Sequence, residues 1–296
     1  MYGSSQIRAL LIFLGPALLA ISVFFFLPVL AALVMSFTDF DIYSLGDIRY
    51  ARFVGFRNYA QLFADPLFWK ALGNTLYFLV VGGPLSVAVS LGAALLLHSR
   101  LVRFKPMFRF IYFMPVVTTL VAIAVVWRYV YHPRFGLLNA AMGALGFAPI
   151  DWLGDPDWAM PALIIMAVWK NFGYNMIIFI AGLQNIPASL YEAASIDGAG
   201  PVQQFIKITL PMLAPTTLFI SIITMIGYFQ FFAEPYVMTL GGPMNSTLSI
   251  VLLMYQQGFR WWNMGYSAAL AFVLFAMILV VSVIQTRLQK QKGGML

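Results

Sequence analysis

The chain has 296 residues, of which 62% are hydrophobic and 9% are charged, and it carries a formal net charge of +7. Soluble domains hold about a quarter charged residues, so this composition excludes a water-soluble globular protein and predicts an all-α integral membrane protein. The chain has no cysteine, which excludes a disulfide framework, thiol catalysis and a cysteine-ligated zinc site.

Six segments are apolar and long enough to cross a bilayer, which needs about 20 residues per helix. We expect transmembrane helices at roughly 10–36, 72–97, 108–131, 160–184, 209–237 and 266–286. The first is too long for the apolar region of a signal peptide, so we expect it to be retained. The predicted regions are a first helix with its outer loop (1–71), a core transmembrane domain (72–287) and a basic tail (288–296).

The excess positive charge gathers on one side of this topology. Arg100, Arg103, Lys105 and Arg109 crowd one short connection between the second and third segments. Both termini and the connection between the fourth and fifth segments lie on the same side, which carries the whole excess of +7. This is the positive-inside pattern, so both termini are predicted to be cytoplasmic and the charge requires no nucleic-acid partner.

Two loops on the predicted outer face are long. Loop 37–71 has room for a short strand or helix lying on that face. Loop 132–159 contains Trp152 and Trp158, which are typical of anchors at the membrane interface.

The fourth segment carries polar side chains at membrane depth, where they are costly and often functional. Asn171 and Tyr174 are three residues apart, and Asn175 is one turn from Asn171, so the three share one helix face. An amide and a phenol beside aromatic rings would suit a sugar, whose hydroxyls take hydrogen bonds and whose C–H faces lie on rings. The alternative is hydrogen bonding between helices of the bundle.

The connection between the fourth and fifth segments contains a short helix of about two turns, too brief and too polar to cross a bilayer. Pro187 suits a first helical turn, and Ser189 with Glu192 has the spacing of a capping box. Gly198 and Gly200 are expected to end the helix by taking positive φ. The exposed side chains are mostly small, which lets another surface approach the backbone closely.

A second short helix is expected directly after these glycines. Its apolar residues at helical spacing would hold the connection down on the bundle. They are Val202, Phe205, Ile206 and Leu210. From the residues alone, the whole stretch could equally be an ordinary connector.

This stretch resembles the EAA loop of type I ABC importer permeases. The matching residues are Glu192-Ala193-Ala194, Asp197-Gly198-Ala199, Ile208 and Leu210-Pro211. The resemblance implies a cytoplasmic coupling helix seated on a separate ATPase. The residues it assigns to this coupling are Glu192, Ala193, Ala194, Asp197 and Gly198.

A second block resembles the carbohydrate-uptake permeases of the maltose and glycerol-phosphate type. It comprises Thr239-Leu240-Gly241-Gly242-Pro243 and Met264-Gly265-Tyr266-Ser267-Ala268-Ala269. The resemblance implies a multi-pass subunit of the bacterial inner membrane that imports a sugar. The implied partners are a second, non-identical permease, a dimer of ABC ATPases and a solute-binding protein that is periplasmic or lipid-anchored.

The same resemblance implies which residues meet the solute. On the fourth span these are Asn171, Tyr174 and Asn175, and on the fifth they are Thr224, Gly227, Tyr228 and Phe231. Asparagines common in maltose-type members are replaced here by Tyr228 and Phe231, so disaccharides, oligosaccharides and glycerol phosphate all stay open. Glu234 could pair with Lys170 or be a solvated end of the fifth span.

We expect no catalytic residue, metal site or cofactor on this chain. It has no glycine-rich loop that could cradle a phosphate, so ATP and Mg²⁺ would be bound by the partner ATPase. A secondary transporter would need membrane-buried ion relays or paired broken helices. A membrane enzyme would need a cluster such as Asp151, Asp155 and Asp157, which has the character of a solvated loop.

Overall fold

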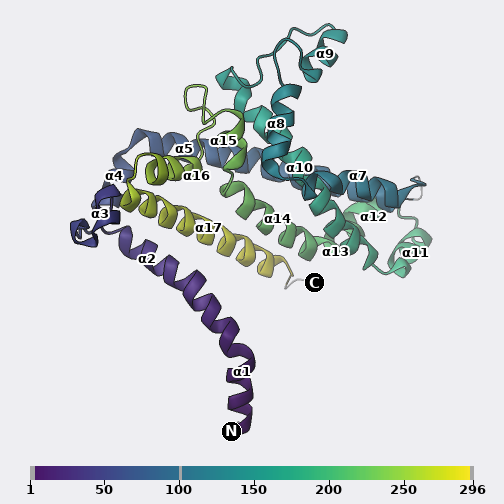
Figure 1. Ribbon diagram of the computed structural model, residues 1–296. Coiled ribbons are helices and arrows are strands. Elements are labelled where there is room, and N and C mark those ends of the chain that lie inside the picture. Colours follow the sequence, from purple (N-terminus) through teal and green to yellow (C-terminus); the bar gives the residue numbers. More distant parts are fainter. Residues whose placement is uncertain (1–3, 100–101, 294–296) are drawn as a thin grey trace. The chain divides into compact units, whose positions relative to one another are not determined.

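The computed structural model describes residues 4–99 and 102–293, and its regular elements are helices (Figure 1). The described residues include one isolated antiparallel bridge, between Thr38 and Phe53. The chain divides into two compact units, which are described separately. The first comprises residues up to Pro66 together with Leu253–Phe275, and the second comprises Leu67–Leu252 and the chain from Ala276 onward.

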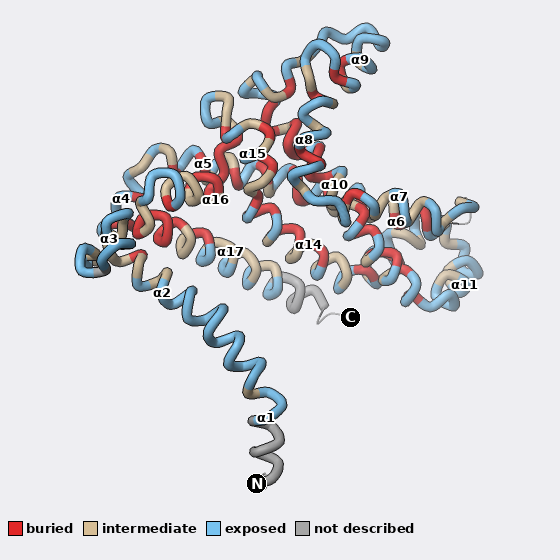
Figure 2. Tube along the Cα trace, in the orientation of Figure 1, coloured by how far each residue is buried: buried red, intermediate tan, exposed pale blue. Residues whose placement is uncertain are grey.

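The first unit begins with a long apolar helix and continues into a folded loop. Its stretch Ile12–Met35 has the length and hydropathy of a membrane span, and none of it is buried within the chain (Figure 2). The helices of the loop confirm that 37–71 contains short helical structure. The elements are α1 (Ser4–Ile21), η1 (Ser22–Phe26), α2 (Leu27–Met35), α3 (Ile42–Gly46), η2 (Ile48–Tyr50) and α4 (Arg57–Ala64).

Hydrogen bonds hold this loop together and tie it to the start of α17 (Met264–Gly293). Within the loop, Asn58 Nδ2 donates to the carbonyls of Ser36 and Thr38, both at 2.8 Å. The Gly265 amide donates to the Phe40 carbonyl at 3.0 Å. Tyr266 donates its hydroxyl to Asp65 at 2.9 Å. A Cβ at Gly265 would collide with the Thr38 carbonyl, so only glycine permits this close approach. These contacts give the loop a defined structure within the first unit.

The second unit is a bundle organised around α10 (Pro156–Gln184). Asp155 caps α10 by accepting a hydrogen bond from the Asp157 amide, and Pro156 occupies the first turn, where its missing N–H costs nothing. A Cβ at Gly173 would collide with the Tyr112 carbonyl, so the backbones of α7 and α10 are in direct contact at this point. Other helices of the unit are α5 (Pro66–Tyr77), η3 (Phe78–Gly82), α6 (Gly83–His98), α7 (Lys105–Val117), α8 (Leu120–Val130) and α9 (Leu137–Ala144).

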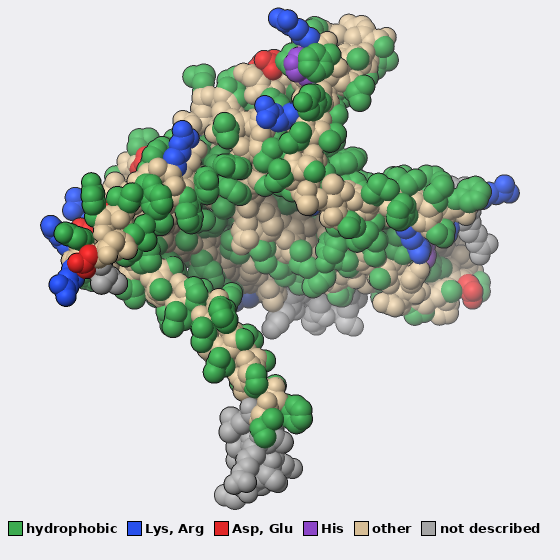
Figure 3. Space-filling model, viewed as in Figure 1, with side chains coloured by type: hydrophobic (Ala, Val, Ile, Leu, Met, Phe, Trp, Pro, Cys, Tyr) green, Lys and Arg blue, Asp and Glu red, His purple; other side chains and the backbone are tan. Residues whose placement is uncertain are grey.

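Four helices can each cross a membrane: Ile12–Met35, Pro66–His98, Pro156–Gln184 and Met264–Arg287. Two bent helix pairs raise the count to six if each pair forms one span. Hydrophobic side chains accordingly cover most of the face in Figure 3. The expectation of an all-helical membrane fold is confirmed, but two of the six predicted spans are broken.

The predicted span 108–131 is the first correction. Helices α7 and α8 meet at a bend of 101°. Pro115 lies inside α7 and cannot donate a backbone hydrogen bond, and Thr118 and Thr119 then adopt extended conformations with ψ near 142° and 137°. The Thr118 hydroxyl donates to the Met114 carbonyl at 3.2 Å, which satisfies a carbonyl that the interrupted helix leaves free.

The predicted span 209–237 is the second correction. A bend of 64° separates Pro201–Met212 from α14 (Ala214–Phe229), and Pro215 fits only the first turn of the new helix. The helix ends at Gln230, and a separate short helix, α15 (Ala233–Met238), follows. Glu234 therefore belongs to α15 and not to the end of the span.

Trp152 is a third correction. Its side chain is 6% exposed, and its Nε1 donates to Asn139 Oδ1 at 2.9 Å. It belongs to the core beneath loop 132–159, because the Asn139 amide satisfies the indole N–H away from any interface. Trp158 is 41% exposed, so interfacial anchoring stays a prediction for Trp158 alone.

Candidate functional site

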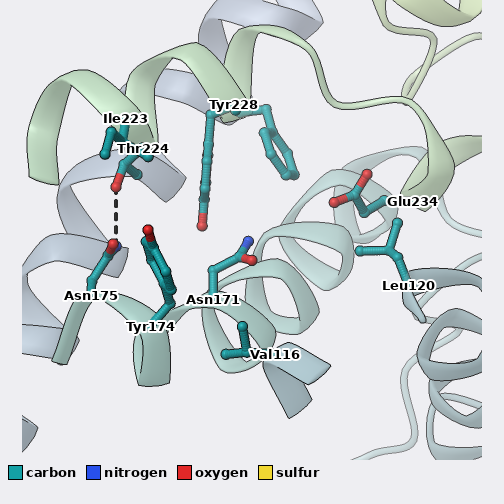
Figure 4. A pocket seen from close by; sticks show the side chains of 11 residues that line it. Val116, Leu120, Asn171, Tyr174, Asn175, Ile223, Thr224, Tyr228 and Glu234 are labelled. Carbon is teal, nitrogen blue, oxygen red and sulfur yellow. Dashed lines mark hydrogen bonds between the residues drawn. The ribbon is translucent and has the colours of Figure 1, made fainter. Parts of the chain in front are cut away.

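A cavity of about 290 Å³ lies inside the second unit, between α10 and α14 (Figure 4). It combines amide, hydroxyl and carboxylate groups with aromatic rings inside apolar helices. The lining residues come from η3, α7, α8, α10, α14 and α15: Phe78, Val116, Leu120, Asn171, Tyr174, Asn175, Ile223, Thr224, Gly227, Tyr228 and Glu234.

The α10 wall of the cavity has the residues that the helical spacing predicted. Asn171, Tyr174 and Asn175 all line it, so their shared face is confirmed. Asn175 is buried and its Nδ2 donates to Thr224 Oγ1 at 3.0 Å, which joins α10 to α14. Tyr174 is 43% exposed. Asn175 thus has a structural bond already, while Asn171 and Tyr174 offer their polar groups to the cavity.

The α14 wall contributes Thr224, Gly227 and Tyr228, which are also spaced for one helix face. A Cβ at Gly227 would meet no atom within 4 Å, so this glycine leaves part of the cavity open. The Tyr228 hydroxyl is buried within interaction distance of the Ser86 and Asn171 side chains, but no hydrogen bond of good geometry joins it to a described residue. An unpaired buried hydroxyl is costly, and a bound solute would supply its partner.

Glu234 is the charged residue of the lining set, and the sequence did not place it there. It is 7% exposed, its carboxylate faces the same space as Asn171 in Figure 4, and it interacts electrostatically with Lys170. The solvated-end alternative is therefore wrong. An acidic residue inside an apolar stretch was the available signal, but its position depends on the end of α14 at Gln230.

Phe231 lies outside the lining set. It is 3% exposed, and its ring stacks on Phe78 with centroids 4.0 Å apart and planes 5° from parallel. Phe78 itself lines the cavity, so Phe231 supports the wall from behind. Phe231 therefore packs within the wall of the cavity, and its direct contact with the solute stays a prediction. Phe78, Val116, Leu120 and Ile223 were missed because apolar residues in apolar segments give no signal.

The polar connection forms a second candidate site. Its helix, α11, runs from Ala188 to Ile196 and ends as expected with Gly198 at φ +78°. The Ala199 amide donates to the Ala194 carbonyl at 2.8 Å and closes the turn. Only glycine adopts this backbone conformation without strain.

The predicted N-terminal capping of α11 and the predicted role of Gly200 are wrong. Pro187 is the N-cap residue of α11, and no side chain caps this helix end, so the Ser189–Glu192 capping box does not form. A proline at the cap has no N–H for the glutamate to accept from. Gly200 has φ −74° and precedes the next helix, α12 (Pro201–Gln204). Gly198 alone makes the turn.

One side of α11 is anchored and the other is free. The Tyr191 hydroxyl lies 2.9 Å from Thr209 Oγ1, and Gln204 Nε2 donates to Ser195 Oγ at 2.9 Å. Glu192 and Ala193 are exposed, and Ile196 is 87% exposed. Sequence reasoning missed Ile196, although a large apolar residue among small ones was visible. The free side therefore presents small, acidic and apolar groups together.

The second short helix does not hold the connection down as expected. Val202 is 70% exposed and Ile206 is 56% exposed. Residues Phe205–Thr209 form a π-helix (η4), whose wider turn shifts the register. Ile208 and Thr209 consequently face the bundle. The helix α13 (Leu210–Met212) then leads into α14.

Comparison with known proteins identifies the family. Residues 86–293 match the family described as binding-protein-dependent transport system inner membrane component. The chain is 39% identical to the lactose transport system permease protein LacF of Rhizobium radiobacter, over 93% of this chain and 91% of that protein. It is 37% identical to the arabinooligosaccharides transport system permease protein AraP of Bacillus subtilis (strain 168), over 96% of this chain and 89% of that protein.

A third relative transports a charged solute. The sn-glycerol-3-phosphate transport system permease protein UgpA of Pectobacterium atrosepticum is 32% identical, over 94% of this chain and 92% of that protein.

The fold is also that of a solved transporter chain. The crystal structure of a bacterial ABC transporter involved in the import of the acidic polysaccharide alginate matches with a TM-score of 0.81 and 21% identity. The match covers 97% of this chain and 96% of that chain. This chain belongs to the family of binding-protein-dependent transport system inner membrane components.

Proposed function

We propose that this chain is the permease subunit of an ATP-driven importer of a neutral sugar, and that the cavity between α10 and α14 is its part of the solute path. The observation that carries the proposal is the cavity lining. It joins the unpartnered Tyr228 hydroxyl and the Asn171 amide with the Phe78 and Tyr174 rings. Hydroxyl and amide groups bond sugar hydroxyls, and aromatic rings accept the apolar faces of the sugar.

The size of the cavity suits a small solute or one part of a larger one. At about 290 Å³ it lies at the lower end of ligand pockets, which run from about 300 to 1,000 Å³. A second, non-identical permease subunit would complete the path for a disaccharide or oligosaccharide. The relatives that transport lactose and arabinooligosaccharides support this solute class.

Glu234 favours a neutral solute over glycerol phosphate. A buried carboxyl group forms hydrogen bonds with hydroxyls, and it offers a phosphate no positive charge. The lining set contains no Lys, Arg or His that could hold a phosphate. Lys170 interacts electrostatically with the Glu234 carboxyl group, but it does not line the cavity. We therefore place the solute among uncharged saccharides.

The free side of α11 is the proposed docking site for an ABC ATPase. Glu192 and Asp197 would meet basic or polar groups of the partner, and Ile196 would enter an apolar recess. ATP and Mg²⁺ would be bound by a dimer of such ATPases, and this chain would receive their motion through α11. Both termini would then be cytoplasmic, and a periplasmic or lipid-anchored solute-binding protein would deliver the sugar from outside.

Filling the cavity tests the proposed path. We expect Gly227→Leu to lower sugar uptake by more than about tenfold in proteoliposomes that contain the complete transporter, because the new side chain would occupy open space. The matched control is Gly73→Leu, since Gly73 on α5 also has no atom within 4 Å of its Cβ position. The sugar is first chosen by ligand-dependent melting of the solute-binding protein with lactose, arabino-oligosaccharides and glycerol phosphate.

Gly227→Leu should still assemble and hydrolyse ATP. Uptake equal to that of Gly73→Leu would contradict the proposed path. If only glycerol phosphate raises the melting temperature of the binding protein, the solute is not a neutral sugar. That result would leave the proposed path intact.

A further inference from the structure

A second hollow in the same unit is separate from the cavity and nearly all apolar. It is a groove of about 560 Å³ where α6, α7 and the Phe172 side chain of α10 meet. Its walls include Leu96, Val102, Phe108 and Phe172, and Tyr112 adds a ring that contacts Phe172 with centroids 5.4 Å apart. It shares no lining residue with the solute cavity.

Cationic residues follow lining residues where α6 ends and α7 begins, at one end of this groove. Arg103 follows the lining residue Val102, and Arg109 follows the lining residue Phe108. Lys105 begins α7 and donates to the His98 carbonyl at the end of α6 at 3.1 Å. The sequence contains no Asp or Glu between Asp65 and Asp151, so α6 and α7 offer these cations no carboxylate of their own.

Arg109, which follows the lining residue Phe108, has a buried donor atom. Its Nε is buried and has no hydrogen-bond partner within the described residues. A guanidinium is always charged, and burying its donors without an anionic or carbonyl partner is costly. The groove end therefore combines an unsatisfied cationic donor with excess positive charge.

We propose that this groove binds an anionic phospholipid, with one acyl chain along the apolar walls and the phosphate at Arg103, Lys105 and Arg109. An acyl chain matches the apolar lining, and basic pockets between transmembrane helices bind lipid headgroups. A helix from another subunit could fill the walls, but it would not bring a phosphate to the Arg109 donor. Charge complementarity at the groove end thus selects the lipid.

The first arm of the test removes charge. The complete transporter is purified from vesicles of equal phosphatidylglycerol and phosphatidylcholine, and native mass spectrometry counts the lipids that stay bound. We expect the wild type to retain phosphatidylglycerol preferentially. Lys105→Gln and Arg109→Gln should each lower that retention about fivefold, the worth of one basic residue near an anionic headgroup. Lys70→Gln, an exposed lysine on α5, is the matched control and should change nothing.

The second arm fills the groove. Gly92 lines it, and a Cβ there would meet no atom within 4 Å, so Gly92→Phe should fit and displace the acyl chain. We expect retention of phosphatidylglycerol to fall at least fivefold, whereas Gly73→Phe on α5 keeps the wild-type level. Soluble glycerol phosphate, which has no acyl chain, should not compete.

Four results would overturn the proposal. One is equal retention of both lipids by the wild type, and another is unchanged retention in the charge variants. The third is effective competition by glycerol phosphate, which would indicate a free-phosphate site. Cross-linking of a cysteine at position 92 to another subunit, with no retained lipid, would assign the groove to a subunit interface instead.

Discussion

The solute cavity and the α11 helix leave different kinds of groups unsatisfied. In the cavity the unsatisfied group is enclosed: the Tyr228 hydroxyl is buried without a well-aligned hydrogen bond to a described residue, and it shares the cavity with Glu234, which is 7% exposed. On α11 the polar groups that face the bundle are paired, whereas Glu192 and Ile196 are open to the surroundings. Enclosed groups suit a small molecule and an exposed helix side suits a protein surface.

The difference teaches how one chain can separate solute contact from energy input. Residues of the cavity are fixed by helix packing, such as the Asn175–Thr224 bond and the stacking of Phe231 on Phe78. Those of α11 are fixed by the Gly198 turn and by two bonds to the following segment. Variants in one region should therefore leave the other region's function unchanged.

The largest effect is expected at the α11 turn. Gly198→Val places a β-branched residue at φ +78°, where such residues are strained, so the free side of α11 should be displaced. We expect ATPase co-purification and uptake to fall by more than about tenfold, because the left-handed region alone costs about 1–2 kcal/mol. Gly200→Val is the matched control, since Gly200 has an ordinary φ of −74°. Equal behaviour of the two variants would show that the turn is not needed.

A smaller effect is expected at Tyr228. Tyr228→Phe removes a hydroxyl that has no well-aligned hydrogen bond to a described residue, so the thermal stability of the transporter should not fall. A hydrogen bond to the solute is worth about 0.5–1.5 kcal/mol, so uptake at low sugar concentration should fall about threefold to tenfold. Tyr266→Phe loses its bond to Asp65 and should lower stability instead. Unchanged uptake with Tyr228→Phe would remove this hydroxyl from the solute contacts.

The smallest effect on uptake is expected at Phe231. Phe231→Leu loses the stacked pair with Phe78, which is worth about 1 kcal/mol beyond the buried area, so the melting temperature should fall. The half-saturating sugar concentration should change less than with Asn171→Ala, because Asn171 lines the cavity and Phe231 does not. A larger change with Phe231→Leu than with Asn171→Ala would support the direct contact expected from sequence.

Local spacing accounts for what the sequence could predict. Residues three or four apart share a face of any helix, as Asn171, Tyr174 and Asn175 do. A glycine directly after a short helix predicts a turn, as at Gly198. These two rules describe neighbours within about one turn, so they hold without knowledge of the packing. The apolar length of the other segments predicted the unbroken membrane-spanning helices.

The sequence could not predict features that depend on contacts between distant residues or on irregular backbone. The position of Glu234 follows from the end of α14 at Gln230, and Phe231 meets Phe78 across about half of the chain. The π-helix at Phe205–Thr209 changes the register between Val202 and Leu210, and Val202 and Ile206 are exposed. An apolar run shows a helix, but it does not show where a proline or a wide turn will break it.

The absence of native cysteine permits the most direct measurement. In the complete transporter, Gly227→Cys and Ile196→Cys are labelled with a thiol reagent, with and without saturating sugar and with and without the ATPase. We predict that sugar slows labelling at position 227 and leaves position 196 unchanged, whereas the ATPase protects position 196 alone. Equal labelling of position 227 with and without sugar would contradict the assignment of the cavity to the solute path.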